Sequence, residues 1–172
     1  MTELEFLKDK SQEEKDEYFM ALAIELAKEA AGRDEVPVGA VIVRGDEIVA
    51  TASNDREESK CATHHAELVC IERACKAMGG WRLPQTTLYV TMEPCVMCAG
   101  AIVNARIPRV VFGTPDLRFG AFGSLIDVSS VPFNHSPEVK GGVLASESLA
   151  LLREYFSQKR KEEKLRKGRS AE

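Results

Sequence analysis

Met92-Glu93-Pro94-Cys95-Val96-Met97-Cys98 is the stretch around which the fold is predicted to form. It acts together with an earlier segment, Thr63-His64-His65-Ala66-Glu67. These two segments supply one imidazole and two thiols, and both kinds of group are good zinc ligands. Three protein ligands leave one coordination position open, which is the arrangement of a zinc site that activates water. We therefore predict a single zinc ion bound by His65, Cys95 and Cys98.

Glu67 is the candidate proton shuttle at this site, and a structural zinc site does not need such a carboxylate. Residues two apart do not share a face of a regular helix, so His65 and Glu67 reach one site only where a helix begins. Cys95 and Cys98 are three apart and share a helix face, and Pro94 suits the start of that helix. Each segment is therefore expected at a helix N-terminus, where the helix dipole favours ionised thiols.

The Cys-x-x-Cys pair taken alone is ambiguous, because redox pairs and structural zinc sites also contain it. A structural site would need a fourth protein ligand, and Cys61 lies close enough in sequence to His65 to provide one. The full pattern is His-x-Glu upstream of Pro-Cys-x-x-Cys, which is the known signature of zinc-dependent nucleobase deaminases. This pattern favours a catalytic site over a structural one.

The composition is typical of a soluble globular protein, with 44% hydrophobic and 29% charged residues among 172. This length suits a single domain with a sizeable core. The apolar runs are too short to span a bilayer and the acidic N-terminus does not resemble a secretory leader, so we expect no membrane segment and a cytoplasmic location. The net charge of −4 disfavours nucleic acid as a partner, but residues 153–172 are basic, which fits either a solvated helix end or an RNA-binding surface.

Hydrophobic periodicity indicates alternating helices and strands. We predict helices at 16–32, 66–78 and 95–104, and a final helix whose apolar stripe contains Leu149, Leu152, Tyr155 and Phe156. We predict strands at 38–43 and 47–52, paired as a hairpin, and further strands at 87–92 and 109–112.

Three segments have no clear periodicity. Residues 1–15 are predicted to be a frayed, acidic lead-in. Residues 113–135 are rich in Gly, Pro, Ser and Asn, and so long a segment is usually functional or disordered. Residues 143–145 fit either a last strand or the entry to the final helix. The order of elements predicts an α/β domain layered around one mixed sheet, with the zinc site where the second and third helices begin.

The chain closely resembles the bacterial tRNA-specific adenosine deaminases over about residues 16–163. Outside the metal segments, the resemblance rests on these stretches: Glu35-Val36-Pro37-Val38-Gly39-Ala40-Val41, Leu88-Tyr89-Val90-Thr91, Ala99-Gly100-Ala101, Arg109-Val110-Val111-Phe112-Gly113, Gly123-Ser124-Leu125 and Phe133-Asn134-His135.

The resemblance implies a three-layer α/β/α cytidine deaminase-like fold with a central mixed sheet of about five strands. It divides the chain into an acidic lead-in (1–15), one zinc-dependent deaminase domain (16–163) and a basic tail (164–172). It implies hydrolytic deamination of adenosine at the wobble position, position 34, of arginine tRNA to inosine, by a zinc-activated water with Glu67 moving the protons. It also implies a homodimer with one zinc per subunit that binds the anticodon stem-loop.

The resemblance further assigns binding residues. It places Asn54 against the purine ring, Pro37 and Val38 in the pocket wall, and backbone groups of Ala66 and Cys95 near the reacting edge. Without the resemblance, Asn54 would be interpreted as an ordinary loop residue. The surface for the anticodon loop would comprise Asp116, Arg118, Asn134, Phe156, Lys159 and Arg160, although Phe156 fits core packing equally well.

Several positions depart from the family pattern. His64 replaces a small residue and competes as a ligand, but the spacing to Glu67 favours His65. Ser53 replaces an aromatic residue, and Leu117-Arg118-Phe119 replaces a small-Lys-Thr sequence. Two rival functions are a zinc-dependent deaminase of a free base or nucleoside of the guanine or cytosine type, and a structural zinc module or RNA-binding protein without catalysis.

Overall fold

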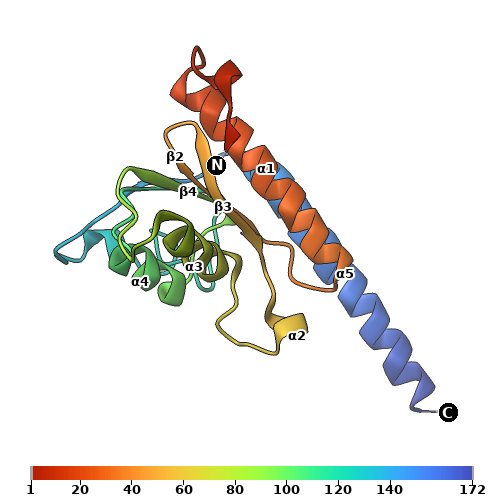
Figure 1. Cartoon of the computed structure of the whole chain (residues 1–172). Helices are drawn as coiled ribbons and strands as arrows, with labels where there is room; N and C mark the ends of the chain where they lie inside the picture. Colours follow the sequence, from red (N-terminus) through yellow and green to blue (C-terminus); the bar gives the residue numbers. More distant parts are fainter. Residues whose placement is uncertain (1, 172) are drawn as a thin grey trace.

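The computed structural model describes residues 2–171, with side chains from residue 4 onward, and is organised around one mixed sheet (Figure 1). Its six strands run in the order β1-β3-β2-β4-β5-β6. Their bounds are β1 Thr2–Glu3, β2 Gly39–Arg44, β3 Glu47–Ser53, β4 Thr86–Met92, β5 Arg109–Thr114 and β6 Glu138–Lys140. The β4–β5 and β5–β6 pairs are parallel, and the other pairs are antiparallel.

Helices cover both faces of the sheet, which confirms the predicted three-layer fold (Figure 1). One face is covered by α1 (Gln12–Gly32) and the first half of α5 (Ala145–Arg169), and the other by α3 (Ala66–Met78) and α4 (Val96–Asn104). Successive strand residues point to opposite faces, so Ile42 joins the core under α3 and α4, whereas Val41 and Val43 join the core under α1.

Residues 2–15 of the lead-in form regular elements instead of fraying, so that prediction is wrong for them, and Met1 lies outside the described residues. β1 adds a two-residue edge to β3, and Glu5–Leu7 forms a short 3-10 helix. Leu7 is only 2% exposed and joins the core under α1. The helix predicted from Asp16 begins earlier, at Gln12, because Ser11 and Glu14 form a capping box. Local capping and one buried leucine therefore order a segment whose average composition is acidic.

Gly39 lets the helix α1 lie directly on the sheet. A Cβ atom at this position would be 1.9 Å from the carbonyl oxygen of Ala23, so any other residue would push α1 away. This close approach holds the start of β2 against α1 at Ala23 and Ala27. The intervening residues 33–38 run beside the loop that follows β3, and this loop leads to the predicted metal ligand His65.

The remaining elements refine the predictions near the C-terminus. Residues 143–145 are the entry to the final helix, which was one of the two alternatives, and Leu144 is the N-cap of α5. The last strand is instead β6, a three-residue parallel addition to β5 that has no clear hydrophobic alternation. The second half of α5 extends beyond the sheet into solvent (Figure 1). No helix between residues 2 and 171 combines the length and apolarity needed to cross a membrane.

Candidate metal centre

His65 and Cys95 are the N-cap residues of α3 and α4, so both metal segments begin helices, as predicted. Pro94 follows the end of β4, and the chain turns there so that Cys98 lies in the first turn of α4. The Nδ1 atom of His65 is 3.6 Å from the Sγ atom of Cys95 and 3.6 Å from that of Cys98. The three ligand atoms all lie within 4.8 Å of one another.

These distances fit a zinc ion without rearrangement of the ligands. Zinc–nitrogen bonds of about 2.0 Å and zinc–sulfur bonds of about 2.3 Å, at a tetrahedral angle, place a nitrogen and a sulfur about 3.5 Å apart. The separations of 3.6 Å from His65 to both cysteines are close to this value. The donor set is also one that zinc prefers, and three protein ligands leave a fourth position for another molecule.

The two thiols of the cluster ionise unequally. The hydrogen bond with the Cys98 thiol, helped by His65, lowers the pKa of Cys95 to about 4. The same hydrogen bond, followed by burial, raises the pKa of Cys98. The hydrogen bond with Cys95 also raises the pKa of His65. Because zinc binds thiolates and neutral imidazole, metal binding at this cluster releases the protons that His65 and Cys98 hold.

Glu67 lies in the first turn of α3 beside the cluster and is 4% exposed. Burial raises the pKa of its carboxyl group to about 7, although the nearby His65 acts in the opposite direction. A cation at the cluster would also lower this pKa. The structure therefore brings Glu67 and the three candidate ligands together, with burial favouring the protonated carboxyl and a bound cation favouring the carboxylate.

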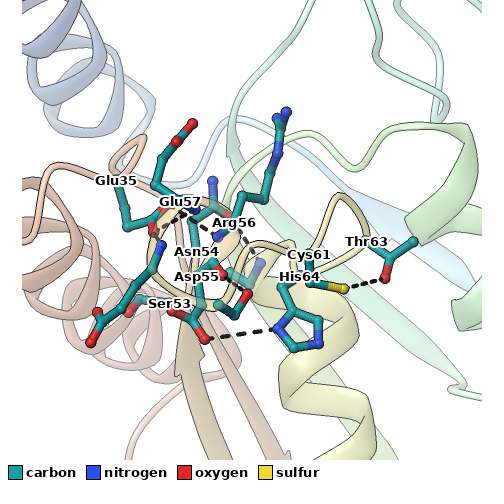
Figure 2. Close-up of polar contacts among 12 residues, drawn as sticks. Glu35, Ser53, Asn54, Asp55, Arg56, Glu57, Cys61, Thr63 and His64 are labelled. Carbon is teal, nitrogen blue, oxygen red and sulfur yellow. Dashed lines mark hydrogen bonds and ion pairs between the residues drawn. The ribbon is translucent and has the colours of Figure 1, made fainter.

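His64 and Cys61 are not part of the cluster of candidate ligands and have other polar contacts, which Figure 2 shows. The Nδ1 atom of His64 faces Asp55 at 3.8 Å, and the Cys61 thiol contacts the Thr63 hydroxyl at 3.3 Å. Within residues 2–171, the group of three metal-binding side chains with closely spaced ligand atoms is His65, Cys95 and Cys98. The contacts of Cys61 therefore do not support a closed, four-ligand structural site.

Asn54 connects the end of β3 to the start of α3. Its Oδ1 atom accepts a hydrogen bond from the backbone N–H of Ala66 at 2.8 Å, and its own N–H donates to the carbonyl of Val38 at 3.0 Å. Pro37 and Val38 are buried beside it, consistent with a wall. Because the N–H of Ala66 is already bonded to Asn54, it orients that side chain and is not free for a ligand.

The six residues expected to contact RNA fall in two regions. In the first, the Asp116 carboxylate accepts hydrogen bonds from the backbone N–H groups of Arg118 and Phe119, so it shapes its own loop. Arg118 itself is exposed, as is Asn134 further along the same long segment.

The second region lies on α5. Phe156 is 44% exposed and packs edge-on against Tyr155, which argues against simple core packing. Lys159 forms an ion pair with Asp34 and a second one with Glu162, whereas Arg160 is exposed.

Two buried glutamates near the cluster were missed by the sequence analysis. Glu93 is 3% exposed, and its carboxylate accepts hydrogen bonds from the backbone N–H groups of Asp116, Phe122 and Ser124. It orders the long segment after β5, where a Cβ on Gly120 would clash with it. Glu35 is 1% exposed and bonds to the loop after Asn54 in a similar way.

Comparison with known proteins agrees with this geometry. Residues 13–114 match the family model of the cytidine and deoxycytidylate deaminase zinc-binding region. The tRNA-specific adenosine deaminase of Bacillus subtilis (strain 168) is 47% identical over 150 residues, which cover 87% of this chain and 93% of that protein. The tRNA-specific adenosine deaminase of Agrobacterium fabrum is 45% identical over 144 residues, covering 83% of this chain and 95% of that protein.

Solved structures show the same relationship. One, from biochemical and structural studies of A-to-I editing by tRNA:A34 deaminases, is 45% identical with a TM-score of 0.76, covering 78% of this chain and 99% of that one. The guanine deaminase from Nitrosomonas europaea is 25% identical with a TM-score of 0.68, covering 81% of this chain and 83% of that one. The family model spans more than half of this chain, and the relatives match over most of their length. The chain therefore belongs to the family of the tRNA-specific adenosine deaminases, hydrolytic enzymes with the cytidine deaminase-like fold.

Proposed function

We propose that this protein deaminates the wobble adenosine, at position 34, of an arginine tRNA, giving inosine and ammonia. The observation that carries the proposal is the placement of the buried carboxyl of Glu67 beside three ligand atoms spaced for one zinc ion. The tRNA substrate is supported by the curated relatives, which are tRNA-specific adenosine deaminases at up to 47% identity. The arginine tRNA and the wobble position come from the resemblance of the motifs.

The chemistry divides between the metal and the chain. His65, Cys95 and Cys98 would hold one zinc ion per subunit, and the ion would supply a water that is acidic enough to ionise near neutral pH. Glu67 would take the proton released from this water and pass it to the ring nitrogen. It would then take a second proton, from the hydroxyl group added to the purine, and pass it to the departing amine. Burial favours the protonated form of this carboxyl and a bound cation would favour the carboxylate, so both forms needed for proton transfer are accessible to Glu67.

Asn54 is proposed to orient the purine. Because its Oδ1 atom accepts the hydrogen bond from Ala66, its side-chain NH₂ group is the part left to face a substrate. Pro37 and Val38 are buried beside this residue and would form the wall of the base pocket. A flipped-out adenine would then be held by one directed hydrogen bond and by apolar contact, as is usual for extruded bases.

The anticodon loop is proposed to bind two exposed surfaces, one on the 115–135 segment and one on α5. Exposed apolar side chains are available there for stacking on splayed bases, among them Phe119, Phe133 and Phe156 at 66%, 53% and 44% exposure. The polar and basic contacts would come from Asp116, Arg118, Asn134, Lys159 and Arg160. The proposal includes a homodimer in the cytoplasm, which the resemblance to the family implies.

A free purine is the second candidate substrate. The guanine deaminase from Bacillus subtilis is 31% identical with a TM-score of 0.56 over 69% of this chain. The zinc ligands and Glu67 would serve either reaction, so the cluster alone does not separate them. What separates them is whether turnover needs an RNA scaffold.

The test is mass-spectrometric nucleoside analysis of an arginine tRNA with adenosine at position 34, after incubation with zinc-loaded protein. Free adenosine, guanine and cytidine are incubated in parallel, together with an arginine tRNA that carries guanosine at position 34. We expect inosine only in the tRNA with adenosine at position 34. Ammonia release from guanine, with no inosine in the tRNA, would instead identify a free-base deaminase.

A further inference from the structure

The carboxylate of Glu35 is almost fully buried, and its hydrogen-bond partners among the described residues are backbone N–H groups rather than arginine or lysine side chains (Figure 2). Its Oε1 atom accepts hydrogen bonds from Glu57 N at 2.8 Å and Glu58 N at 2.9 Å, and its Oε2 atom accepts one from Arg56 N at 3.1 Å. These donors belong to α2 (Arg56–Ser59), a single turn in the loop between β3 and α3. A buried charge in such a place has a structural consequence, because breaking its hydrogen bonds is costly.

Glu35 caps the N-terminus of α2, a role that the N-cap residue next to a helix usually fills. The first N–H groups of a helix have no partner within the helix, and a side chain at the N-cap usually accepts one of them. The N-cap residue of α2, Asp55, makes no such hydrogen bond. Glu35 replaces it from a distant segment and bonds three N–H groups at once, with a negative charge where the helix dipole favours one.

This cap matters because α2 lies between two residues of the candidate site. Asn54 precedes α2 and His65 follows it. Arg33, two residues before Glu35, reinforces the same arrangement: its Nη2 atom donates to Ser53 Oγ at 2.7 Å and to the carbonyl of Asn54 at 3.2 Å. The backbone N–H of Asn54 is in turn bonded to Val38. The segment 33–38 therefore holds residues 53–58, the first half of the loop between β3 and α3.

We infer that Glu35 is a positioning residue for deamination: through α2 it fixes the orientation of Asn54 against the N-terminus of α3. Its kinetic consequence rests on the proposed function, since Asn54 is expected to contact the purine. Loss of the cap leaves the zinc ligands unchanged but frees the loop, and misplacement of an orienting group by about 1 Å reduces turnover by up to about a hundredfold.

The experiment compares Glu35→Gln and Glu35→Ala with the wild type. Glutamine keeps one carbonyl oxygen for Glu57 and Glu58 but turns an NH₂ group towards the Arg56 N–H, so it keeps part of the cap. Asp16→Asn is the matched control, because it also neutralises a fully buried carboxylate, on the α1 side of the sheet away from the cluster. For each protein, kcat and KM for the tRNA, zinc content and backbone amide exchange are measured.

We expect kcat to fall about tenfold for Glu35→Gln and about a hundredfold for Glu35→Ala. We expect KM for the tRNA to stay within about twofold, because the anticodon surface is unchanged. Zinc content should stay at the wild-type level, and faster amide exchange should be confined to residues 54–65. The Asp16→Asn control should keep the wild-type kcat at a temperature where it is folded.

A double-mutant cycle tests whether Glu35 acts through Asn54. In an Asn54→Ala background, Glu35→Gln should change kcat by less than about twofold, because the group that it positions is gone. A full tenfold loss in that background, an equal loss in Asp16→Asn, or an unchanged kcat in Glu35→Ala would overturn the inference. If the wild type forms no inosine, the proposed function fails, and amide exchange in 54–65 alone then decides whether Glu35 orders the loop.

Discussion

The guanidinium of Arg109 makes a two-pronged ion pair with the buried carboxylate of Asp16, with Nη1···Oδ1 and Nη2···Oδ2 distances of 2.7 and 2.8 Å. The hydroxyl of Tyr89 donates to the same carboxylate at 2.8 Å, and Lys140 Nζ lies 3.0 Å from it. This network ties the start of α1 to β4, β5 and β6. It stands on the α1 side of the sheet, whereas the metal ligands lie at the starts of α3 and α4 on the other side.

Replacement of Asp16 should therefore lower stability without lowering the activity of the folded protein. Asp16→Asn removes the carboxylate and leaves two cations without their buried partner, which we expect to cost about 3 kcal/mol in the free energy of unfolding. Urea denaturation at pH 7 measures this loss. Glu138→Gln is the control, because Glu138 also pairs with Arg109 but is largely exposed, so it should change stability little. Equal losses in the two variants would contradict this account.

The same network makes stability depend on pH. Burial alone would raise the pKa of the Asp16 carboxyl, but hydrogen bonds from Arg109, Tyr89, Gln12 and Lys140 together hold it well below its ordinary value. A carboxyl whose pKa is depressed by folding stabilises the protein above its unfolded pKa of about 4, and this contribution is lost as the pH falls towards the folded pKa. The stability difference between wild type and Asp16→Asn should thus be largest near pH 7 and shrink below about pH 4. A constant difference between pH 7 and pH 3 would show that the carboxylate charge is not its source.

Glu67→Gln should abolish turnover while leaving the metal in place. Glutamine has nearly the same size and removes no ligand, but it neither accepts nor returns a proton. We expect kcat to fall by at least about a thousandfold, within the range for loss of a general acid and base, and zinc content to remain at the wild-type level. Glu72→Gln, on the exposed side of the same helix, is the control and should retain activity. Appreciable turnover by Glu67→Gln would remove this residue from the proton path.

The metal centre and the elements beside it were predictable because their signals are local. α3 has the predicted bounds, Ala66–Met78, since Gly79 takes up the left-handed conformation (φ 72°) that ends a helix. The ligand spacing required helix starts at His65 and Cys95, and both residues are N-caps. For the same reason the β2–β3 hairpin was predictable: Gly45 has φ 62° in the turn between two apolar runs.

The parts that were missed depend on contacts between distant segments. Glu35 and Glu93 resemble ordinary charged residues in the sequence, and only the fold shows that each accepts three backbone N–H groups. The 113–135 segment has no periodicity because Glu93, not a hydrophobic stripe, orders much of it. β1 and β6 are too short to show an alternation of apolar and polar residues in the sequence. Each strand forms by pairing with a longer neighbouring strand, β3 or β5.

Zinc retention distinguishes the cysteines of the cluster from Cys61. We expect Cys98→Ser to retain less than about a tenth of the wild-type zinc after dialysis, because one of three protein ligands is lost from a buried position. Cys61→Ser is the matched control and should keep its zinc, since Cys61 contacts Thr63 outside the cluster. Elemental analysis of both purified variants gives the zinc per chain. Loss of zinc from Cys61→Ser would instead indicate a fourth protein ligand.

If basic residues of α5 contact tRNA phosphates, replacing one of them should change the salt dependence of tRNA binding. Arg160 is exposed on the helix, whereas Lys159 already forms an ion pair with Asp34, so Arg160 is the freer of the two to contact a phosphate. Each phosphate contact adds about 0.7 to 0.9 to the slope of log affinity against log salt concentration. Arg160→Gln should therefore reduce that slope by about this amount and weaken binding most at low salt. Lys28→Gln, an exposed lysine of α1 outside the proposed surface, is the control and should leave the slope unchanged. If Arg160→Gln and Lys28→Gln bind tRNA alike at every salt concentration, the projecting half of α5 is a solvated helix end and the RNA is held elsewhere.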